Sequence, residues 1–230
     1  MARSALITGG TGGLGSAVTQ TFLDAGWRVV VPLYDEAERE RVPQHEQLVL
    51  EQADLFHPGS AAAVTAIAAG DEQAPLGAVV NLVGGFATGG RVHEMPIGDY
   101  EAQLRLNLRP TYLVCQAALP HLLAAGGGAI VCVSSRAALK PFQGAAGYVV
   151  AKAAVLAFVD VLATEYRNDD VRANAILPSV VDTPANRRSM PDADHERWVT
   201  PQQIADVVRF LCEDGSGVVS GAHVPVYGRA

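Results

Sequence analysis

SALITGGTGGLGSAVTQTFLDAGWRVVV, residues 4–31, is the stretch that decides the fold. It begins with an apolar segment at 4–8, passes through a glycine-rich run at 9–15, and then shows apolar residues at helical spacing up to Gly26. A second apolar segment follows at 27–31. This order predicts a strand, a glycine turn, a helix and a second strand. Because glycines let the backbone approach a pyrophosphate and a helix N-terminus offers N–H donors, the unit is typical of dinucleotide binding.

The glycine run fits two spacings equally well. G-x-G-x-x-G at 10–15 is the general dinucleotide fingerprint, and T-G-x-x-x-G-x-G at 8–15 is a different arrangement of the same turn. A tight turn that binds nothing is the alternative. The run lacks the Gly-Lys-Ser/Thr ending of an ATP or GTP phosphate loop, which disfavours those ligands.

Length and composition predict one α/β domain covering residues 1–230, because strands alternate with helical segments and no linker interrupts them. The net charge of −7, without a basic stripe, disfavours nucleic-acid and anionic-membrane partners. The N-terminus shows no signal-peptide pattern, and we expect no membrane partner. Cys115, Cys132 and Cys212 lie in apolar segments, which favours buried thiols in a reducing cytoplasm. The histidines show no metal-ligand spacing, so no metal site is predicted.

Hydrophobic periodicity predicts a doubly wound, seven-stranded parallel sheet with helices on both faces, in the order 3-2-1-4-5-6-7. The ligand crevice of such a sheet lies at the carboxyl ends of the strands, beside strand 1. Strands are predicted near 3–8, 27–33, 47–51, 76–83, 128–134, 171–177 and 222–226, and helices near 13–25, 58–69, 97–125, 146–167 and 201–213.

Tyr148 and Lys152 are the strongest indication of a catalytic site in the sequence. They are four residues apart on a predicted helix and therefore project from one face, one turn apart. We expect the ammonium to lower the pKa of the phenol from about 10, so that Tyr148 can exchange a proton near neutral pH. Ser135 follows the apolar run 129–134, which predicts that it lies at the ligand end of a strand. The alternative is that the Tyr148 ring only packs on its neighbours and Lys152 is solvated, without a catalytic role for either.

Six ordered motifs resemble those of the short-chain dehydrogenase/reductase family, and in particular its 3-oxoacyl-ACP reductase-like members. The resemblance spans nearly the whole chain and implies a single-domain Rossmann fold that transfers hydride between a nicotinamide cofactor and a carbonyl/alcohol pair. Leu82, Val83 and Ser179 depart from the family pattern. The motifs are the glycine turn at 8–15, Asp54-Leu55, the segment 81–84, Asn107, the set Ser135, Tyr148 and Lys152, and the segment 178–184.

The resemblance implies four catalytic residues. Tyr148 would exchange the proton of the substrate oxygen, while Lys152 lowers its pKa and hydrogen-bonds the nicotinamide ribose. Ser135 would hold the substrate oxygen, and Asn107 would position a water that links Lys152 to solvent. A purely structural role stays open for two of them: Ser135 could simply end a strand, and Asn107 could form a hydrogen bond with a nearby backbone group.

The cofactor-binding set is also implied by the resemblance. Asp54 would contact the adenine, and Thr183 with the Val181 backbone would orient the nicotinamide amide. Asp54 could instead be an ordinary loop cap, and Asn81 could stabilise the sheet. The full set is Gly9, Thr11, Gly12, Gly13, Leu14, Gly15, Leu33, Tyr34, Asp54, Leu55, Asn81, Val83, Gly84, Tyr148, Lys152, Pro178, Val181 and Thr183.

The choice of nicotinamide cofactor is decided after the second strand. Leu33 and Tyr34 stand where relatives carry an acid for NAD or an arginine for NADP. Asp35 and Glu36 follow and would repel a 2′-phosphate, which favours NAD(H) over NADP(H). Arginines in the run 35–41 could reach back, although such a run is more typical of a solvated helix face.

A substrate loop is predicted at 184–200, short and polar, over a small-molecule carbonyl or alcohol. Arg187 and Arg188 could meet an anionic substrate or be solvated, and Phe86 and Phe142 could line the site or pack in the core. The resemblance implies a homotetramer, or a homodimer, built on two long helices. The residues predicted for that interface are Leu104, Leu108, Tyr112, Val155, Val159 and Leu162, which could equally face the sheet.

Two other functions compete with an oxidoreductase. A non-catalytic regulatory or sensor protein could use the same fold, since fold does not fix function. An isomerase or epimerase could use the same tyrosine with tightly held NAD, although such relatives carry a larger C-terminal substrate region.

Overall fold

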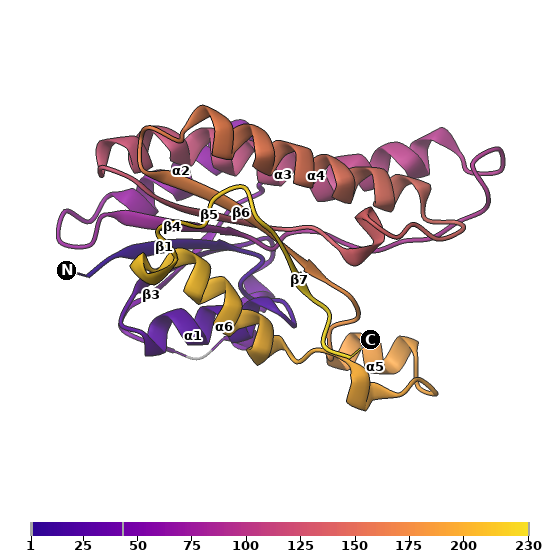
Figure 1. Cartoon of the computed structure of the whole chain (residues 1–230). Helices are drawn as coiled ribbons and strands as arrows, with labels where there is room; N and C mark the ends of the chain where they lie inside the picture. The colour runs from indigo at the N-terminus through magenta and orange to yellow at the C-terminus, as the bar shows by residue number, and fades with distance from the viewer. Residues whose placement is uncertain (1, 43, 230) are drawn as a thin grey trace.

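The computed structural model describes residues 2–42 and 44–229, so the two ends of the predicted domain, 1 and 230, lie outside the described residues. Its seven strands form one parallel sheet in the order β3-β2-β1-β4-β5-β6-β7, which confirms the predicted winding (Figure 1). The strands are β1 (Ser4–Thr8), β2 (Arg28–Leu33), β3 (Leu48–Gln52), β4 (Leu76–Asn81), β5 (Gly128–Val133), β6 (Val171–Pro178) and β7 (His223–Val226).

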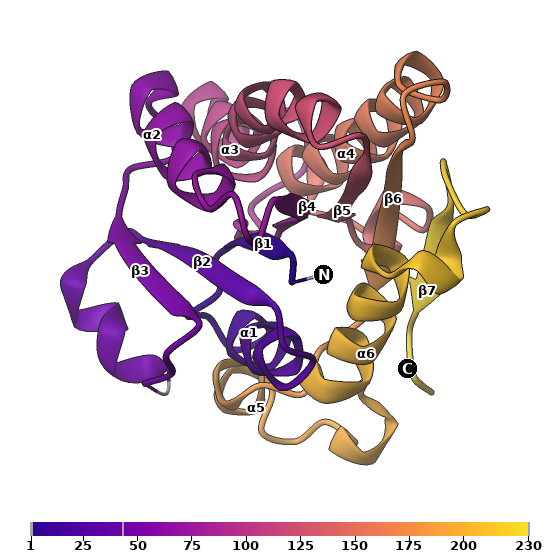
Figure 2. The same cartoon turned by 90° about the vertical axis from the view of Figure 1, so that its left-hand side faces the viewer.

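Helices cover both faces of the sheet, as Figure 2 shows end-on. On one face lie α1 (Gly15–Asp24) and α6 (Pro201–Cys212), which pack on each other. On the other face lie α2 (Pro58–Ala69), α3 (Ile97–Ala124) and α4 (Ala146–Glu165). All observed bounds lie within two residues of the predicted ones.

Five short helices were not among the predicted elements. Each is one or two turns long, too short for hydrophobic periodicity to register. The run after β2 folds as one of these short 3-10 helices, and its charged residues other than Glu38 are exposed, as expected. The five are η1 (Glu36–Arg41), η2 (Arg136–Ala138), α5 (Pro184–Ser189), η3 (His195–Arg197) and η4 (Asp214–Ser216).

The central strands are buried on both faces, and this is why they read as continuous apolar runs. Successive residues of β1 enter different cores: Leu6 packs with α2, α3 and α4, and Ile7 packs with α1 and α6. Both side chains are fully buried. The helices are thereby fixed against the sheet, and the loops at the strand ends are held in place.

The interface residues predicted on α4 face the sheet instead. Val155, Val159 and Leu162 are buried in the core, so the alternative that the sequence left open, that they face the sheet, is the one observed. The large apolar residues of α4 that are exposed are Val150 and Val161, which lie on the opposite side of the helix. Periodicity identifies an amphipathic helix, but it cannot say which side meets the sheet when both sides are apolar.

One helix in the described part of the chain, α4, is long and apolar enough to cross a membrane by length and composition alone. A core helix passes the same test. Here α4 packs on α3 and β6, with Lys152 buried in its course.

Candidate active site

The glycine turn between β1 and α1 requires glycine at two points. Gly9 has a φ of 67°, in the left-handed region that glycine adopts freely. A Cβ on Gly15 would overlap the carbonyl oxygen of Gly9, so α1 can begin this close to β1 only with a glycine there. A Cβ on Gly13 would lie 3.0 Å from Cγ2 of Thr183, which brings the loop after β6 against the turn.

The turn fits a dinucleotide pyrophosphate. Gly12 and Gly13 are exposed, and among the described residues no side chain caps the N-terminus of α1. A helix N-terminus without a capping side chain or acidic residue favours an anion, through N–H donors and the macrodipole. Nicotinamide cofactors carry such an anion, so the residues present are suited to hold one.

Ser135 and Tyr148 meet at the carboxyl end of β5. Ser135 is the second residue after the strand and is buried, and Tyr148 lies in the first turn of α4. Burial raises the pKa of Tyr148 above about 10, and a hydrogen bond with Ser135 lowers it in part. The structure thus brings the predicted pair together and keeps the phenol protonated at neutral pH.

Lys152 is buried one turn further along α4. Its Nζ donates to the carbonyl oxygen of Val133 at 3.0 Å and lies 5.9 Å from the centroid of the Tyr148 ring. The expected lowering of the Tyr148 pKa by Lys152 was wrong for this structure, because burial of the phenol dominates. Burial also lowers the pKa of Lys152, to about 8.

Asn107 holds the loop after β4. Its Oδ1 accepts from the backbone N–H of Gly85 at 3.1 Å, and its Nδ2 donates to the Gly85 oxygen at 3.0 Å. A Cβ on Gly84 would lie 2.7 Å from Oδ1 of Asn107 and 3.0 Å from Nζ of Lys152. Asn107, Lys152 and Gly84 therefore meet, and backbone binding by Asn107, left open by the sequence, is observed.

Two residues of the predicted cofactor set make structural contacts. The Nδ2 of Asn81 points into the core, 3.3 Å from the sulfur of Cys115 and 3.7 Å from that of Cys132. The Oδ1 of Asp54 accepts from the backbone N–H of Phe56 at 2.9 Å, which is the contact of a loop cap. The structural role left open for each from the sequence, packing against the sheet for Asn81 and loop capping for Asp54, is therefore observed.

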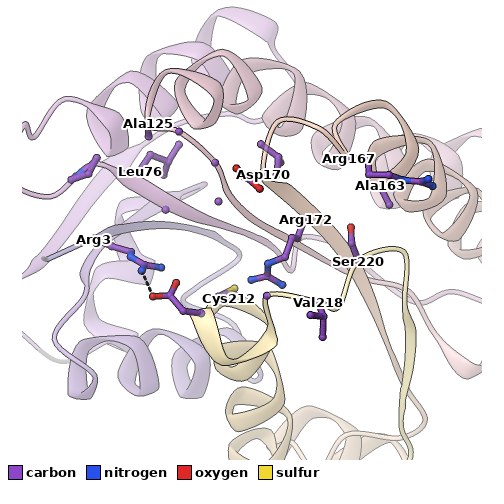
Figure 3. Close-up of a pocket in the computed structure, with 18 of the residues that line it drawn as sticks. Arg3, Leu76, Ala125, Ala163, Arg167, Asp170, Arg172, Cys212, Val218 and Ser220 are labelled. Atoms are coloured by element: carbon purple, nitrogen blue, oxygen red, sulfur yellow. Dashed lines mark hydrogen bonds and ion pairs between the residues drawn. The ribbon is translucent and has the colours of Figure 1, made fainter.

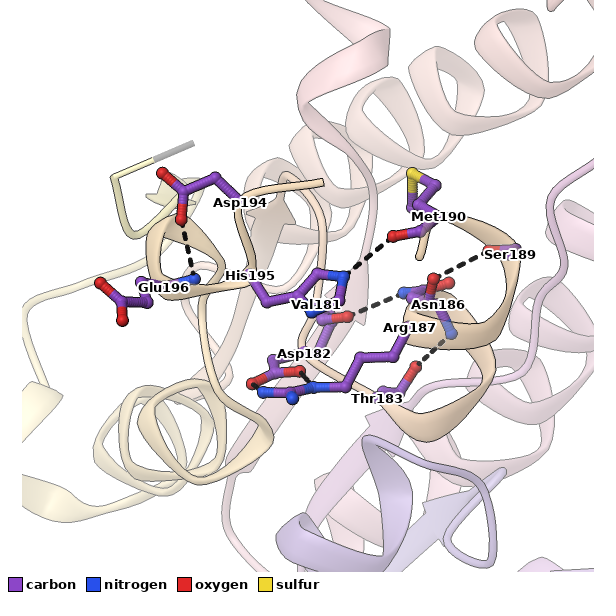
Figure 4. Close-up of polar contacts among 10 residues, drawn as sticks. All are labelled: Val181, Asp182, Thr183, Asn186, Arg187, Ser189, Met190, Asp194, His195 and Glu196. Atoms are coloured by element: carbon purple, nitrogen blue, oxygen red, sulfur yellow. Dashed lines mark hydrogen bonds and ion pairs between the residues drawn. The ribbon is translucent and has the colours of Figure 1, made fainter. Parts of the chain in front are cut away.

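The loop after β6 is stabilised by hydrogen bonds and an ion pair between its own residues (Figure 4). Thr183 caps α5 by accepting from the N–H of Asn186, and Asn186 donates to the Val181 oxygen at 2.8 Å. Arg187 forms a paired contact with Asp182, which holds the pKa of that carboxyl below its usual range. Arg187 therefore already has a partner within the loop, while Arg188 is exposed.

An aromatic wall, formed by Phe86 and Phe142, stands beside the tyrosine. The Phe86 ring meets the Tyr148 ring edge-on at 5.1 Å between centroids and lies 6.2 Å from the Phe142 ring. Phe86 is 63% exposed and Phe142 is 48% exposed, so neither is a core residue. The sequence left their role open, because only the fold brings these two loops together.

At the end of β2, Leu33 is fully buried. Tyr34 is 70% exposed and extends beside the crevice. Asp35 caps η1 by accepting from the N–H of Ala37 at 2.9 Å. The remaining predicted residues lie in the loops at this same edge: Thr11 is buried, Leu14, Val83 and Val181 are half-buried, and Leu55 and Pro178 are buried.

A hollow lies at the opposite end of the sheet (Figure 3). It measures about 1050 Å³ and is lined at the starts of β4, β5 and β6, by Leu76, Gly128 and Val171 among others. None of the predicted site residues lines it. Opposite charges pair there, with Arg3 Nη2 2.6 Å from Asp214 Oδ2. Within residues 2–42 and 44–229, no group of three His, Cys, Asp or Glu side chains could hold a metal ion.

Comparison with known proteins gives consistent matches. The profile of the family described as short chain dehydrogenase matches residues 3–194. The 2-(R)-hydroxypropyl-CoM dehydrogenase of Xanthobacter autotrophicus is 32% identical, covering 96% of each chain. The D-threitol dehydrogenase of Mycolicibacterium smegmatis is 31% identical over 97% of this chain and 91% of its own. A structure of ElxO with NADP bound superposes with a TM-score of 0.92 at 22% identity, covering 99% and 98% of the two chains; at that identity it shows the fold alone.

Proposed function

We propose that this chain, which belongs to the short-chain dehydrogenase family and is an NAD(P)-dependent oxidoreductase of a carbonyl/alcohol pair, is an NADH-dependent carbonyl reductase for small apolar ketones. Its site would contain Asn107, Ser135, Tyr148 and Lys152. The observation that carries the proposal is the meeting of Ser135, Tyr148 and Lys152 at the carboxyl end of β5.

The bound nicotinamide supplies the hydride, and the chain's own residues handle the proton. The raised pKa of Tyr148 keeps its hydroxyl protonated at neutral pH, which supports a general acid that donates to the carbonyl oxygen. Ser135 donates a second hydrogen bond to that oxygen as charge develops on it. Lys152, still largely protonated below pH 8, stabilises the phenolate that proton donation leaves behind.

The aromatic wall supports an apolar substrate. Phe86 and Phe142 expose their rings beside the Tyr148 ring, where the group attached to a carbonyl carbon would lie. Arg187 is engaged by Asp182, which weakens the case for an anionic substrate. A ketone with an aryl or alkyl group would cover this surface and remove it from water.

Assembly through α3 and α4 is part of the proposal. Tyr112 on α3 and Val161 on α4 are each 47% exposed, and the rings of Tyr112 and Phe158 lie 5.7 Å apart. A groove of about 770 Å³ runs between these helices and the loop at Phe56. An exposed apolar surface of this kind fits a second copy of the chain and supports a homodimer or homotetramer. The free, buried thiols of Cys115, Cys132 and Cys212 support a reducing, cytoplasmic setting.

The function is tested with Tyr148→Phe. We expect the variant to lose turnover of a ketone panel by about a thousandfold, since general acid catalysis and transition-state contacts at this oxygen are removed together. NADH affinity, followed by cofactor fluorescence, should stay within about twofold. A variant that retains turnover would contradict the proposed acid, and loss of turnover together with unchanged cofactor binding separates an enzyme from a sensor.

The substrate class is tested with Phe86→Ala. We expect kcat/KM for an aryl methyl ketone to fall about tenfold, because truncating an aromatic contact surface removes roughly 1–2 kcal/mol. A small polar ketone such as hydroxyacetone serves as the matched substrate and should change less than twofold. Equal losses for both ketones would mean that the wall positions Tyr148 and does not select the substrate.

A further inference from the structure

Ser134, the first residue after β5, connects that strand with the backbone of α4. Its Oγ donates to the carbonyl oxygen of Lys152 at 2.7 Å, and its backbone N–H donates to the carbonyl oxygen of Ile176 on β6 at 2.9 Å. Ser134 is only 2% exposed, so its hydroxyl is not available to a ligand. A hydroxyl buried this deeply needs a hydrogen-bond partner, and here the partner lies on the helix that carries Tyr148.

Lys152 is held at two points by consecutive residues of the chain. Its Nζ donates to the carbonyl oxygen of Val133 at 3.0 Å, and its own carbonyl oxygen accepts from Ser134. We call these two hydrogen bonds the lysine clamp. The first fixes the direction of the side chain, and the second fixes the turn of α4 from which that side chain starts.

The bond from Ser134 is not required by the helix itself. In an α-helix each interior carbonyl oxygen accepts from the N–H four residues further on, and Lys152 lies well inside α4 (Ala146–Glu165). A carbonyl oxygen has two lone pairs, so the hydroxyl adds a second bond to an oxygen that already has a partner. The bond therefore serves to fix α4 against the end of β5.

The proposed reacting groups stand on both sides of this contact. Ser135 comes from the end of β5, whereas Tyr148 and Lys152 come from α4. A shift between the two elements would separate the serine from the tyrosine, and a misplacement of about 1 Å can cost roughly a hundredfold in rate. We infer that Ser134 is a positioning residue, whose hydroxyl holds the catalytic turn of α4 in register with the end of β5; the inference rests on the proposed function.

The titration of Lys152 reports whether the clamp is closed, because burial lowers its pKa to about 8. Two titratable groups lie near the ammonium: Tyr148 on α4, with its ring centroid at 5.9 Å, and Cys132 on β5. On α3, Asn107 lies nearby and does not titrate. A change at Ser134 alters none of these groups. If α4 moves off β5, we expect water to reach the ammonium and its pKa to rise towards 10.5.

The experiment compares the wild type with Ser134→Ala, Ser134→Thr and Ser4→Ala. Because the Lys152 oxygen keeps its helical bond, Ser134→Ala leaves no buried acceptor without a partner and should fold. Ser134→Thr keeps the hydroxyl. Ser4→Ala is the matched control, since Ser4 is also fully buried and donates to the carbonyl oxygen of Ala74 at 2.7 Å, at the other end of the sheet. Thermal unfolding verifies that each variant is folded.

Reduction of a ketone by NADH is measured between about pH 6 and pH 10. We expect Ser134→Ala to lower kcat about tenfold and to leave KM for the ketone within about twofold, because the reacting groups move while the apolar contacts of the ketone remain. The basic limb of its kcat profile should move up by about half a pH unit or more. Ser134→Thr and Ser4→Ala should keep kcat within about threefold and the limb within about 0.2 pH unit.

A second readout does not depend on turnover. The unfolded chain binds more protons than the folded chain between the two pKa values of Lys152, so the free energy of unfolding, relative to Lys152→Met, rises from about pH 8 to pH 10. The same difference, measured between Ser134→Ala and its double variant with Lys152→Met, should show less than about half of this rise, because the ammonium is already hydrated in the folded state.

A folded Ser134→Ala variant whose basic limb and unfolding difference match the wild type would overturn the assignment, even if its kcat falls. So would a Ser134→Thr variant as slow as Ser134→Ala, or an equal change in Ser4→Ala. A wild type that reduces no ketone would overturn the proposed function itself, while the unfolding difference would still test the lysine clamp.

Discussion

Tyr148 and Lys152 lie one turn apart in a long helix, whereas Glu38 reaches Thr11 from a 3-10 helix of six residues inserted after β2. The half of the site proposed for catalysis, the catalytic half, stands on regular elements that pack on the sheet. The half proposed for the adenosine of the cofactor, the adenosine half, stands on loops and short helices. The catalytic half can therefore be predicted from spacing along the chain, and the adenosine half cannot.

The two halves also differ in how they treat charge. Lys152 is buried and contacts a backbone oxygen, so its charge is held at the expense of stability. Glu38 remains partly exposed and forms an ion pair with Arg41. The catalytic half therefore holds a buried charge without a charged partner among the contacts given for Lys152, whereas Glu38 has one.

The largest effect is expected at the turn that both halves share. Gly15→Ala places a methyl group on the carbonyl oxygen of Gly9, a backbone atom that cannot rotate away. We expect the free energy of unfolding to fall by about 3 kcal/mol or more, as for a severe overpacking change, and NADH affinity to fall at least a hundredfold. Chemical denaturation and calorimetry measure the two quantities.

Gly59→Ala is the control for this change. Gly59 is also a helical glycine, in α2, and a Cβ there would meet nothing within 4 Å. Alanine should leave stability equal or raise it by about 0.5–1 kcal/mol, since glycine is the poorer helix former. A Gly15→Ala protein as stable and as tightly bound as Gly59→Ala would show that α1 can shift away from the turn.

Much of the fold could be predicted from the sequence, since every main strand and helix is long enough to show its hydrophobic periodicity. The order of the sheet was predictable from the alternation of strand and helix. The meeting of Ser135 with Tyr148 was predicted because both lie at ends of regular elements. The pKa of Tyr148 was not, because it depends on burial, and burial depends on loops from elsewhere in the chain.

The contacts of the aromatic wall and of Glu38 could not be predicted from the sequence. Phe86 and Phe142 are 56 positions apart, and no period relates the two loops that bring them together. Glu38 lies five positions beyond Leu33, where an acid is expected, and only the turn of η1 brings its carboxylate back to β2. Both contacts depend on irregular backbone.

Removal of the buried charge is expected to have an intermediate effect. The pKa of Lys152 is about 8 in the folded protein and 10.5 when unperturbed, so the unfolded chain binds more protons between these values. The penalty for charging Lys152 is fully present below pH 8 and disappears as pH rises towards 10.5. The free energy of unfolding of the wild type, relative to Lys152→Met, should therefore rise by roughly 2 kcal/mol between about pH 8 and 10.

Urea denaturation of both proteins across this range measures the difference, and groups common to both cancel. Lys140→Met, at an exposed lysine, is the matched control for loss of a lysine. If the free energies of unfolding of the wild type and Lys152→Met change equally with pH, burial of Lys152 does not destabilise its charged form.

The smallest effect is expected at the second acid of the adenosine half, Asp54. Its Oδ1 accepts from the N–H of Phe56, while the carboxylate stays 40% exposed beside the crevice edge. We expect Asp54→Ala to lose about 1 kcal/mol of stability with the cap and to bind NADH about fivefold more weakly with the adenine contact. Asp54→Asn keeps an acceptor and should restore most of the stability. If Asp54→Ala binds NADH as tightly as the wild type, the carboxylate only caps its turn and makes no contact with the adenine.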